Sequence, residues 1–160
     1  IKLMAPDAIM PTKAHTTDAG YDLYALDYHT DINGNLVYRT GVAMEIPEGY
    51  VGLMFPRSSI AKKDIALTNC VGVIDSGYRG EILTKFKPTY QCMLVQNEED
   101  AAHGESESLR GYAPVPPAYY EVGERIAQII IMPYPEVEFE LVSELSESER
   151  GNGGYGSSGK

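Results

Sequence analysis

The chain has 160 residues, a formal net charge of −10 and 43% hydrophobic residues, a composition typical of one soluble globular domain with a sizeable core. No apolar run reaches the roughly 18 residues of a transmembrane helix, and Ile1–Met4 lack the apolar stretch of a signal peptide. We therefore expect no membrane contact and a cytoplasmic location, or the interior of a host cell if the source is viral. The negative charge argues against stable nucleic-acid binding, because a polyanion would be repelled.

Short runs rich in β-branched and aromatic residues, separated by turn signals, fill most of the chain. Asn33-Gly34 predicts a hairpin turn after a strand at Asp27–Ile32. The one helical candidate is Ser58–Asp64, where Ser58 or Ser59 is expected to cap a short turn. The other predicted strands are Val42–Ile46, Tyr50–Phe55, Ile65–Thr68, Gly72–Ile74, Glu81–Lys87, Gln91–Gln96, Arg125–Met132 and Val137–Val142. This pattern predicts an all-β barrel or sandwich with one short helix.

The segment Ile126–Met132 is apolar on both faces, which predicts a central strand buried on two sides. Gln128 is the one polar residue that interrupts it. A hydrogen-bonded core amide and a ligand-binding amide are equally good interpretations at this point.

Two segments depart from the strand pattern. Asn97–Pro117 is acidic with little apolar pattern, so we expect a long loop or hairpin inserted at about residues 97–117. Ser143–Glu149 is rich in serine and glutamate and is expected to be a flexible tether. We therefore predict a β-domain over residues 1–142 and a C-terminal arm over 143–160. Cys70 and Cys92 form no metal-binding motif and are expected to be free, buried thiols.

The arm ends in Arg150–Lys160, which combines an arginine, an aromatic ring and two hydroxyls with many glycines. Glycines let successive N–H groups turn toward one anion, Arg150 offers a forked cation, and Tyr155 can stack on a flat ring. This combination is typical of a lid that closes on a bound nucleotide. By composition alone, a frayed terminus is an equally open interpretation.

Four internal segments carry further polar chemistry, and each has a plain alternative as a turn, a helix cap or a core amide. Thr17–Ala25 contains two acids, and Pro56–Ala61 joins Arg57 to two serines at a helix start, which favours an anion site. Asn69–Gly80 places Asp75 directly after an apolar strand, where a carboxylate can act as a general base. The fourth segment is Gly123–Gln128.

Together with the arm, these segments resemble the five motifs of the trimeric deoxyuridine triphosphatase (dUTPase) family, in the same order, from about Pro11 to Lys160 apart from the acidic insert. The resemblance implies hydrolysis of dUTP to dUMP and pyrophosphate, which keeps uracil out of DNA and supplies dUMP. It also implies distorted jelly-roll β-barrel subunits with one short helix and a flexible C-terminal arm, assembled as a homotrimer with shared active sites.

The resemblance implies a role for each matching residue. Asp75 would activate the water that attacks the α-phosphorus, and Asp22 would orient waters on Mg²⁺, the expected cofactor, which the substrate phosphates mainly hold. The hairpin from Asn69 to Asp75, including Gly72, Val73 and Ile74, would read uracil, and Tyr78 would lie under the sugar. The residues that would contact the phosphates or close over the nucleotide are Arg57, Ser58, Ser59, Gln128, Arg150, Tyr155, Gly156, Ser157 and Ser158.

The sequence departs from the family at three of these positions. The family more often has Gly where Ser59 stands, Phe where Tyr155 stands and Thr where Ser158 stands. Tyr155 and Ser158 keep the stacking and hydrogen-bonding chemistry. Three alternatives remain at this point. They are the related dCTP deaminases, which share the fold, a nucleotide-gated regulatory module that contacts a protein partner through the insert at residues 97–117, and a purely structural jelly roll.

Overall fold

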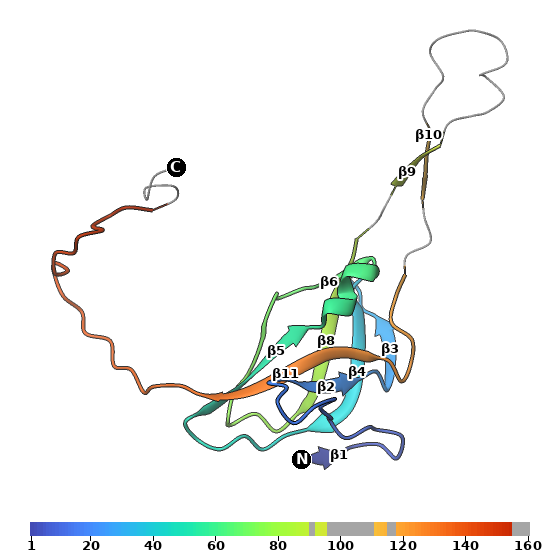
Figure 1. The fold of residues 1–160 in the computed structure, drawn as a ribbon, viewed down its shortest axis with the longest axis horizontal. Helices are drawn as coiled ribbons and strands as arrows, with labels where there is room; N and C mark the ends of the chain where they lie inside the picture. The colour runs from blue at the N-terminus through green and yellow to red at the C-terminus, as the bar shows by residue number, and fades with distance from the viewer. Residues whose placement is uncertain (90–91, 96–110, 115–117, 155–160) are drawn as a thin grey trace, which may run out of the picture.

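The structure is a computed structural model that describes residues 1–89, 92–95, 111–114 and 118–154, the side chains of 92–95 and 111–114 excepted. The described residues form strands and one short 3-10 helix, η1 (Ser58–Lys62) (Figure 1). The strands are β1 (Lys2–Leu3), β2 (Tyr21–Tyr24), β3 (Asp27–Thr30), β4 (Leu36–Ala43), β5 (Tyr50–Pro56), β6 (Ile65–Leu67), β7 (Gly72–Ile74), β8 (Glu81–Pro88), β9 (Cys92–Val95), β10 (Gly111–Pro114) and β11 (Arg125–Pro133). None of the helical structure in these residues is long and apolar enough to cross a membrane.

Two antiparallel sheets make up the body. One has the order β1-β4-β8-β6 with β3 added on β4, and the other has the order β2-β11-β5-β7. Side chains from both sheets meet in a single core, which includes Leu23, Tyr38, Ile82, Phe86 and Ile129. The predicted all-β, jelly-roll-like class with one short helix is confirmed.

The core follows from strand periodicity and from a cluster of aromatic rings. Along β8, alternate side chains point inward, so Ile82, Thr84 and Phe86 are fully buried while their neighbours face solvent. The rings of Tyr38 and Phe86 pack edge to face at 5.8 Å, and Tyr120 packs against both. The Tyr38 hydroxyl donates to the carbonyl of Tyr120 at 3.0 Å, and burial raises the pKa of Tyr38 to about 12.

The predicted hairpin at Asn33-Gly34 is confirmed, because β3 pairs with β4 across that turn and Gly34 has φ of 78°. The Asp31 carboxylate accepts the N–H groups of Asn33 and Asn35, both at 2.9 Å. These bonds and Lys85 lower the pKa of Asp31. The strand after the turn lies earlier than predicted: it is Leu36–Ala43, and Val42–Ile46 is wrong by several residues.

The helical expectation is right in place but wrong in its cap. The helix spans Ser58–Lys62, its N-cap is Arg57, and no side chain caps it. Neither Ser58 nor Ser59 therefore has the predicted capping role.

The interpretation of β11 as a central strand is confirmed, because β11 lies between β2 and β5. Its burial differs along its length. Ile126, Ala127 and Ile129 are buried, whereas Ile131 and Met132 are 37% and 43% exposed in the single chain. The strand therefore begins in the core and ends at the surface.

Two further predictions are wrong. Val137–Val142 forms no strand, because no strand of the described body pairs with it, and Phe139 and Leu141 are almost fully exposed. Residues 134–154 instead leave the body as an extended arm (Figure 1). Cys70 is exposed rather than buried, because it lies in the turn between β6 and β7, where its φ is 60°. The side chain of Cys92 lies outside the described residues.

The strand predicted at Gln91–Gln96 is present as β9, which pairs with β10 in a hairpin that projects from the body (Figure 1). Of the predicted insert at residues 97–117, only 111–114 are described. The rest of that prediction lies outside the described residues.

Candidate functional site

A pocket of about 300 Å³ collects residues from three of the motif segments. Adjacent strands create it, because Asp22 on β2 faces Gln128 on β11, and Gln128 faces Phe55 on β5. The lining residues are Ala14, Asp18, Ala19, Gly20, Asp22, Arg57, Ser58, Gln128 and Ile130. Four residues with predicted site roles, Asp22, Arg57, Ser58 and Gln128, are thus brought together in one chain.

Asp22 is the electrostatic centre of this pocket. Its Oδ1 accepts a hydrogen bond from Arg57 Nε at 2.6 Å, and its Oδ2 lies 3.3 Å from a terminal nitrogen of Arg125. The Asp22 side chain is 11% exposed, so both charge-assisted bonds are shielded from solvent. A guanidinium has five N–H donors, and the bond from Nε leaves Arg57 with further donors for an anion.

Gln128 is hydrogen-bonded and lines the pocket, and its contact with a ligand remains a prediction. Its Nε2 donates to the carbonyl of Pro56 at 3.1 Å, which secures the backbone immediately before Arg57. Its Oε1 lies so close to Gly20 that a Cβ at that position would come within 2.6 Å of it. The amide is hydrogen-bonded and also lines the pocket, and any larger residue at position 20 would displace it.

The two serines of the second motif point to different surroundings. Ser58 is exposed and lines the pocket. The Ser59 hydroxyl lies 3.4 Å from the hydroxyl of Tyr120, and Ser59 is not among the lining residues. Its phosphate contact remains a prediction.

The third motif lies on a different part of the body. β7 pairs with β5 through Gly52 and Ile74, so Asp75 follows the end of β7 near the start of β5. Arg57 follows the opposite end of β5, and five residues of strand separate Gly52 from Arg57, a distance of roughly 16 Å. Asp75 is exposed and does not line the pocket. One chain therefore holds the two halves of the predicted site apart.

The predicted uracil and sugar contacts surround Asp75. The N–H of Tyr78 donates to the carbonyl of Asp75 at 3.0 Å, and the Tyr78 hydroxyl donates to the carbonyl of Glu81 at 2.9 Å. The Tyr78 ring packs on Gly80 so closely that a Cβ there would overlap it. These contacts fix the ring. A hollow of about 620 Å³ is lined by the neighbouring residues Ser76, Gly77 and Arg79 and by the Glu45–Glu48 turn, but Tyr78 is not among its lining residues.

The base of the predicted uracil hairpin is also ordered by short contacts. The N–H of Val71 donates to the carbonyl of Asn69 at 2.6 Å. Gly72 is buried against Met54, whose terminal methyl would lie 2.8 Å from a Cβ there. Val73, by contrast, is 61% exposed at the edge of the sheet, because β7 is the last strand of its order.

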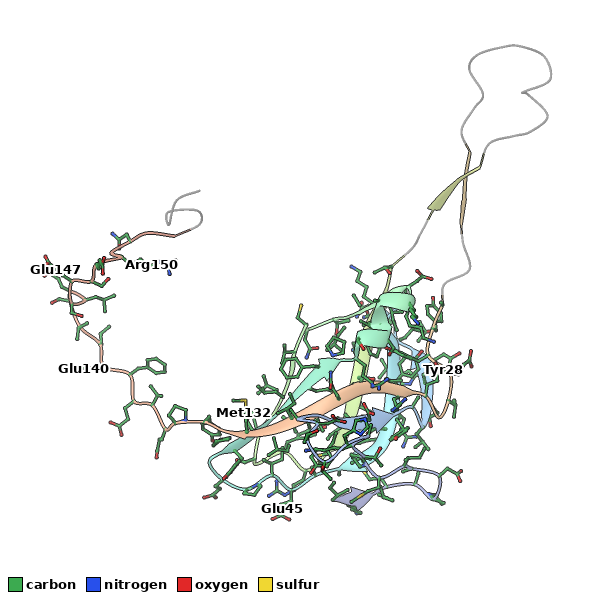
Figure 2. The ribbon with its side chains drawn as sticks, viewed as in Figure 1. Tyr28, Glu45, Met132, Glu140, Glu147 and Arg150 are labelled. Carbon is green, nitrogen blue, oxygen red and sulfur yellow. The ribbon has the colours of Figure 1, made fainter. Side chains whose placement is uncertain are left out.

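The arm keeps its first motif residue away from the pocket. Arg150 lies on the extended arm, far from the body (Figure 2), and its Nε donates to the carbonyl of Gly153 at 2.9 Å. The predictions for Tyr155, Gly156, Ser157 and Ser158 lie outside the described residues.

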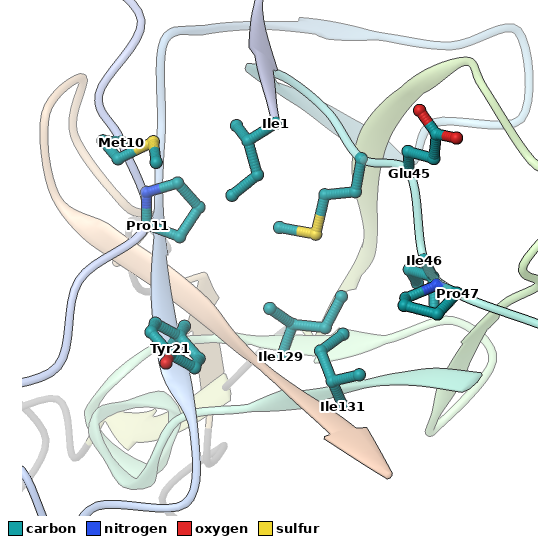
Figure 3. Close-up of a pocket in the computed structure, with 10 residues that line it drawn as sticks. Ile1, Met10, Pro11, Tyr21, Glu45, Ile46, Pro47, Ile129 and Ile131 are labelled. Carbon is teal, nitrogen blue, oxygen red and sulfur yellow. The ribbon is translucent and has the colours of Figure 1, made fainter. Parts of the chain in front are cut away.

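An apolar pocket of about 380 Å³ lies between β2, β11 and the first residues of the chain (Figure 3), on the opposite face of the sheet from the polar pocket, because its lining residues alternate with those of the polar pocket along both strands. Tyr21, Ile129 and Ile131 line it together with Met10 and Pro11. It offers little to a phosphate, but it extends the apolar surface formed by the exposed end of β11.

Two residues that shape the polar pocket have no role in the sequence interpretation. Arg125 enters it only as the first residue of a predicted strand, yet it holds Asp22 from the second side. Gly20 enters it only as part of the segment Thr17–Ala25, yet its missing side chain makes room for Gln128. The useful signal for both was the strand pairing of β2 with β11, which a single sequence does not display.

These features define an all-β protein with a polar pocket organised by a paired arginine and aspartate. The dUTPase family model matches residues 6–93 and 116–159. Curated relatives named deoxyuridine 5'-triphosphate nucleotidohydrolase include those of Cutibacterium acnes, 36% identical over 96% of this chain and 87% of the relative, and Clostridium tetani, 37% identical over 100% and 95%.

Solved structures agree with these relatives. A mutant dUTPase of Staphylococcus bacteriophage 80alpha with dUpNHpp has a TM-score of 0.76 and 35% identity, covering 99% of this chain and 96% of that one. Another structure of the phage 80alpha enzyme with dUPNHPP, described as controlling transfer of virulence genes by a proto-oncogenic G protein-like mechanism, has a TM-score of 0.74 at 35% identity and the same coverage. The chain belongs to the dUTPase family and is a dUTP nucleotidohydrolase.

Proposed function

We propose that this enzyme works as a homotrimer in which the pocket of one copy receives Asp75 and Tyr78 from another. The observation that carries the proposal is the separation of roughly 16 Å along β5 between Arg57 and the end of β7. That distance is too large for one chain to hold both the phosphates and the attacking water. A second copy would supply the missing half.

Apolar side chains that are exposed in the single chain support the same arrangement. The exposed end of β11, the apolar pocket beside it and the extended residues Val137–Val142 together present apolar side chains that the single chain leaves uncovered. Exposed apolar side chains in such numbers are typical of protein–protein contacts. We assign it to contacts between copies, with residues 1–142 as the body and 143–160 as an arm that closes over the nucleotide.

In the proposed mechanism, Asp75 takes a proton from a water as the water oxygen attacks the α-phosphorus. The bond from that phosphorus to the bridging oxygen breaks, and pyrophosphate leaves with the bridging oxygen's electron pair. Arg57, Ser58 and Gln128 hold the phosphates and offset their charge. Tyr78 packs under the sugar and leaves no room for a ribose hydroxyl.

The donor set suits a magnesium ion that arrives with the substrate. The described residues contain no group of three metal-binding side chains. Asp22 and Asp18 both line the pocket, however, and a carboxylate bonded to two arginines still has lone pairs for water. Asp22 would contact the water shell of the ion, and the bound ion would neutralise charge on the phosphates.

A subunit-mixing experiment tests the shared site. Asp75→Asn and Arg57→Ala proteins should each be nearly inactive, but refolding them together should restore activity, because some sites then receive both wild-type residues. The matched control mixes Arg57→Ala with Gln128→Ala, which lie in the same pocket of one chain and so cannot complement each other. No recovery in the first mixture, with trimers present in sedimentation, would refute a site shared in this way.

The family match favours dUTP hydrolysis over the related dCTP deamination.

A regulatory role remains a second candidate, because phage dUTPases are described as controlling transfer of virulence genes by a G protein-like mechanism. The family match passes over residues 94–115, so the insert is where this chain would contact a partner. This role would be supported if the enzyme retains one host or phage protein and if dUpNHpp changes that retention. Replacing residues 97–117 by a short turn should then abolish it.

A further inference from the structure

A lysine–glutamate ion pair joins the end of η1 to the turn before β11. Lys63 Nζ donates to Oε2 of Glu124 at 3.0 Å and to the carbonyl of Tyr119 at 2.7 Å. The same nitrogen lies 4.9 Å from the centre of the Tyr120 ring. The side chain of Lys63 is 18% exposed and that of Glu124 is 43% exposed, so the pair is shielded on the lysine side only.

This pair closes a ring of contacts around the polar pocket. Glu124 precedes Arg125, whose guanidinium holds Asp22, and Asp22 holds Arg57 at 2.6 Å. Arg57 in turn begins η1, and the residue after η1 is Lys63. Every link in the ring is therefore an ion pair or a short covalent stretch.

η1 needs an external anchor. It is a five-residue 3-10 helix with no side-chain cap and no buried residue of its own. The hydrogen bonds of such a helix are weak, and Ile60, the residue of η1 that packs against the core, is only partly buried. Polar contacts add to this packing: the Ser59 hydroxyl lies 3.4 Å from that of Tyr120, Lys63 bonds to Glu124, and the Asp64 carboxylate accepts the N–H of Ala118.

The anchor on the other side is firmly held. Tyr120 is 2% exposed, and its carbonyl accepts the hydroxyl of Tyr38 at 3.0 Å. The backbone of Ala25 bonds to both Gly123 and Glu124, at 2.7 and 2.9 Å. The turn before β11 is itself exposed, but Tyr120 and the bonds to Ala25 fix it to the body, so a group that binds to the turn is held relative to the barrel.

We propose that Lys63 and Glu124 are positioning residues for the substrate phosphates. By tying η1 to the turn before β11, they hold Arg57 and Ser58 against Gln128 in the geometry that a triphosphate requires. The inference rests on the proposed phosphate role of Arg57 and Ser58, and it adds two residues that touch no substrate atom.

The test compares ligands with and without phosphates. Lys63→Met keeps the apolar stem but removes the ammonium, so Kd for dUpNHpp and KM for dUTP should rise about tenfold, as expected for loss of ~1.4 kcal/mol of positioning. Kd for deoxyuridine, which has no phosphate, should stay the same, and kcat should change less than KM. Lys63→Arg should restore most of the affinity.

Two controls make the result specific. Lys85→Met breaks another lysine–carboxylate pair, in which Lys85 lies 3.0 Å from Asp31. Because this pair is not linked to the pocket, Kd, KM and kcat should stay unchanged. Glu124→Gln should reproduce Lys63→Met, and the double variant should be no worse than either single one, because both break the same contact. Glu124→Gln also serves if Lys63→Met fails to fold.

The outcomes separate this inference from the proposed function. If Arg57→Ala weakens dUpNHpp binding but Lys63→Met and Glu124→Gln lower only Tm, the ion pair is purely structural and the inference is wrong. If Arg57→Ala leaves dUpNHpp binding unchanged, the phosphate assignment itself is wrong and the inference falls with it. Weakened dUpNHpp binding in all three variants, with deoxyuridine binding intact, supports both.

Discussion

Arg57 and Asp22, 35 residues apart in the chain, form an ion pair of 2.6 Å between Nε and Oδ1. The pair orients the guanidinium from the side, so its remaining donors are available to the pocket that both residues line. An aspartate expected to serve a metal ion therefore also orients the arginine that we propose binds phosphate.

We predict that Asp22→Asn impairs both substrate binding and folding. The amide cannot accept two charge-assisted bonds as a carboxylate does, so Arg57 and Arg125 lose their common anchor. The free energy of unfolding should fall by ~1–3 kcal/mol, and KM for dUTP should rise. Urea unfolding and steady-state kinetics check this, and unchanged KM would contradict the orienting role.

Tyr78 is predicted to set the preference for deoxyribose. Its ring is held by Gly80 and by the hydrogen bond to the Glu81 carbonyl, so it cannot easily move to admit a ribose hydroxyl. Wild-type enzyme should use UTP far less well than dUTP, and Tyr78→Ala should narrow the ratio of kcat/KM values. Tyr78→Phe keeps the ring and should keep the preference. Equal use of both nucleotides by the wild type would refute the assignment.

The arm is predicted to contribute to catalysis but not to folding. Deleting Arg150–Lys160 should leave Tm unchanged, since the described part of that segment adds little to the core, and should abolish most activity. Tyr155→Ala should weaken dUpNHpp binding by ~1–3 kcal/mol if its ring stacks on the base, with Tyr155→Phe close to wild type. Full activity after truncation would return the arm to the interpretation of a frayed end.

Two buried threonines should respond in opposite ways to valine. Thr84 Oγ1 is buried without a hydrogen-bond partner in the described structure, so Thr84→Val should stabilise the protein by about 1 kcal/mol. Thr40 Oγ1 donates to the carbonyl of Ile82 at 2.7 Å, so Thr40→Val should destabilise it by ~1–2 kcal/mol. Chemical denaturation of both variants tests this, and equal effects would contradict the assignment of Thr84 as unpaired.

Alkaline pH should destabilise the fold through Tyr38. Its pKa is raised to about 12 in the folded protein from an ordinary value of 10.0, so the unfolded chain loses this proton first. The stabilisation is complete below pH 10 and is lost as pH rises through 12. Tyr38→Phe should flatten this part of the stability profile, and an unchanged slope would show that other groups cause it.

Much of the fold could be predicted from the sequence, because the alternation of side chains along a strand and the residue preferences of turns are local properties. The β3–β4 turn follows from Asn33-Gly34, and the central place of β11 follows from its apolar run. Val137–Val142 shows the limit of such reasoning. It has the alternation of a strand, but a strand needs a hydrogen-bonded neighbour, and the described body supplies none.

The sequence alone was enough to predict the family and the candidate site residues, because motif order and residue type do not depend on where each segment lies. Tertiary structure alone decided which of them meet. Pairing of β2 with β11 brought Asp22 to Gln128 and gave Arg125 its partner, while the pairing of β7 with β5 placed Asp75 at the far end of the strand. These relationships depend on register between segments distant in the chain, which is set by the packing of the whole barrel and leaves no local pattern in the sequence.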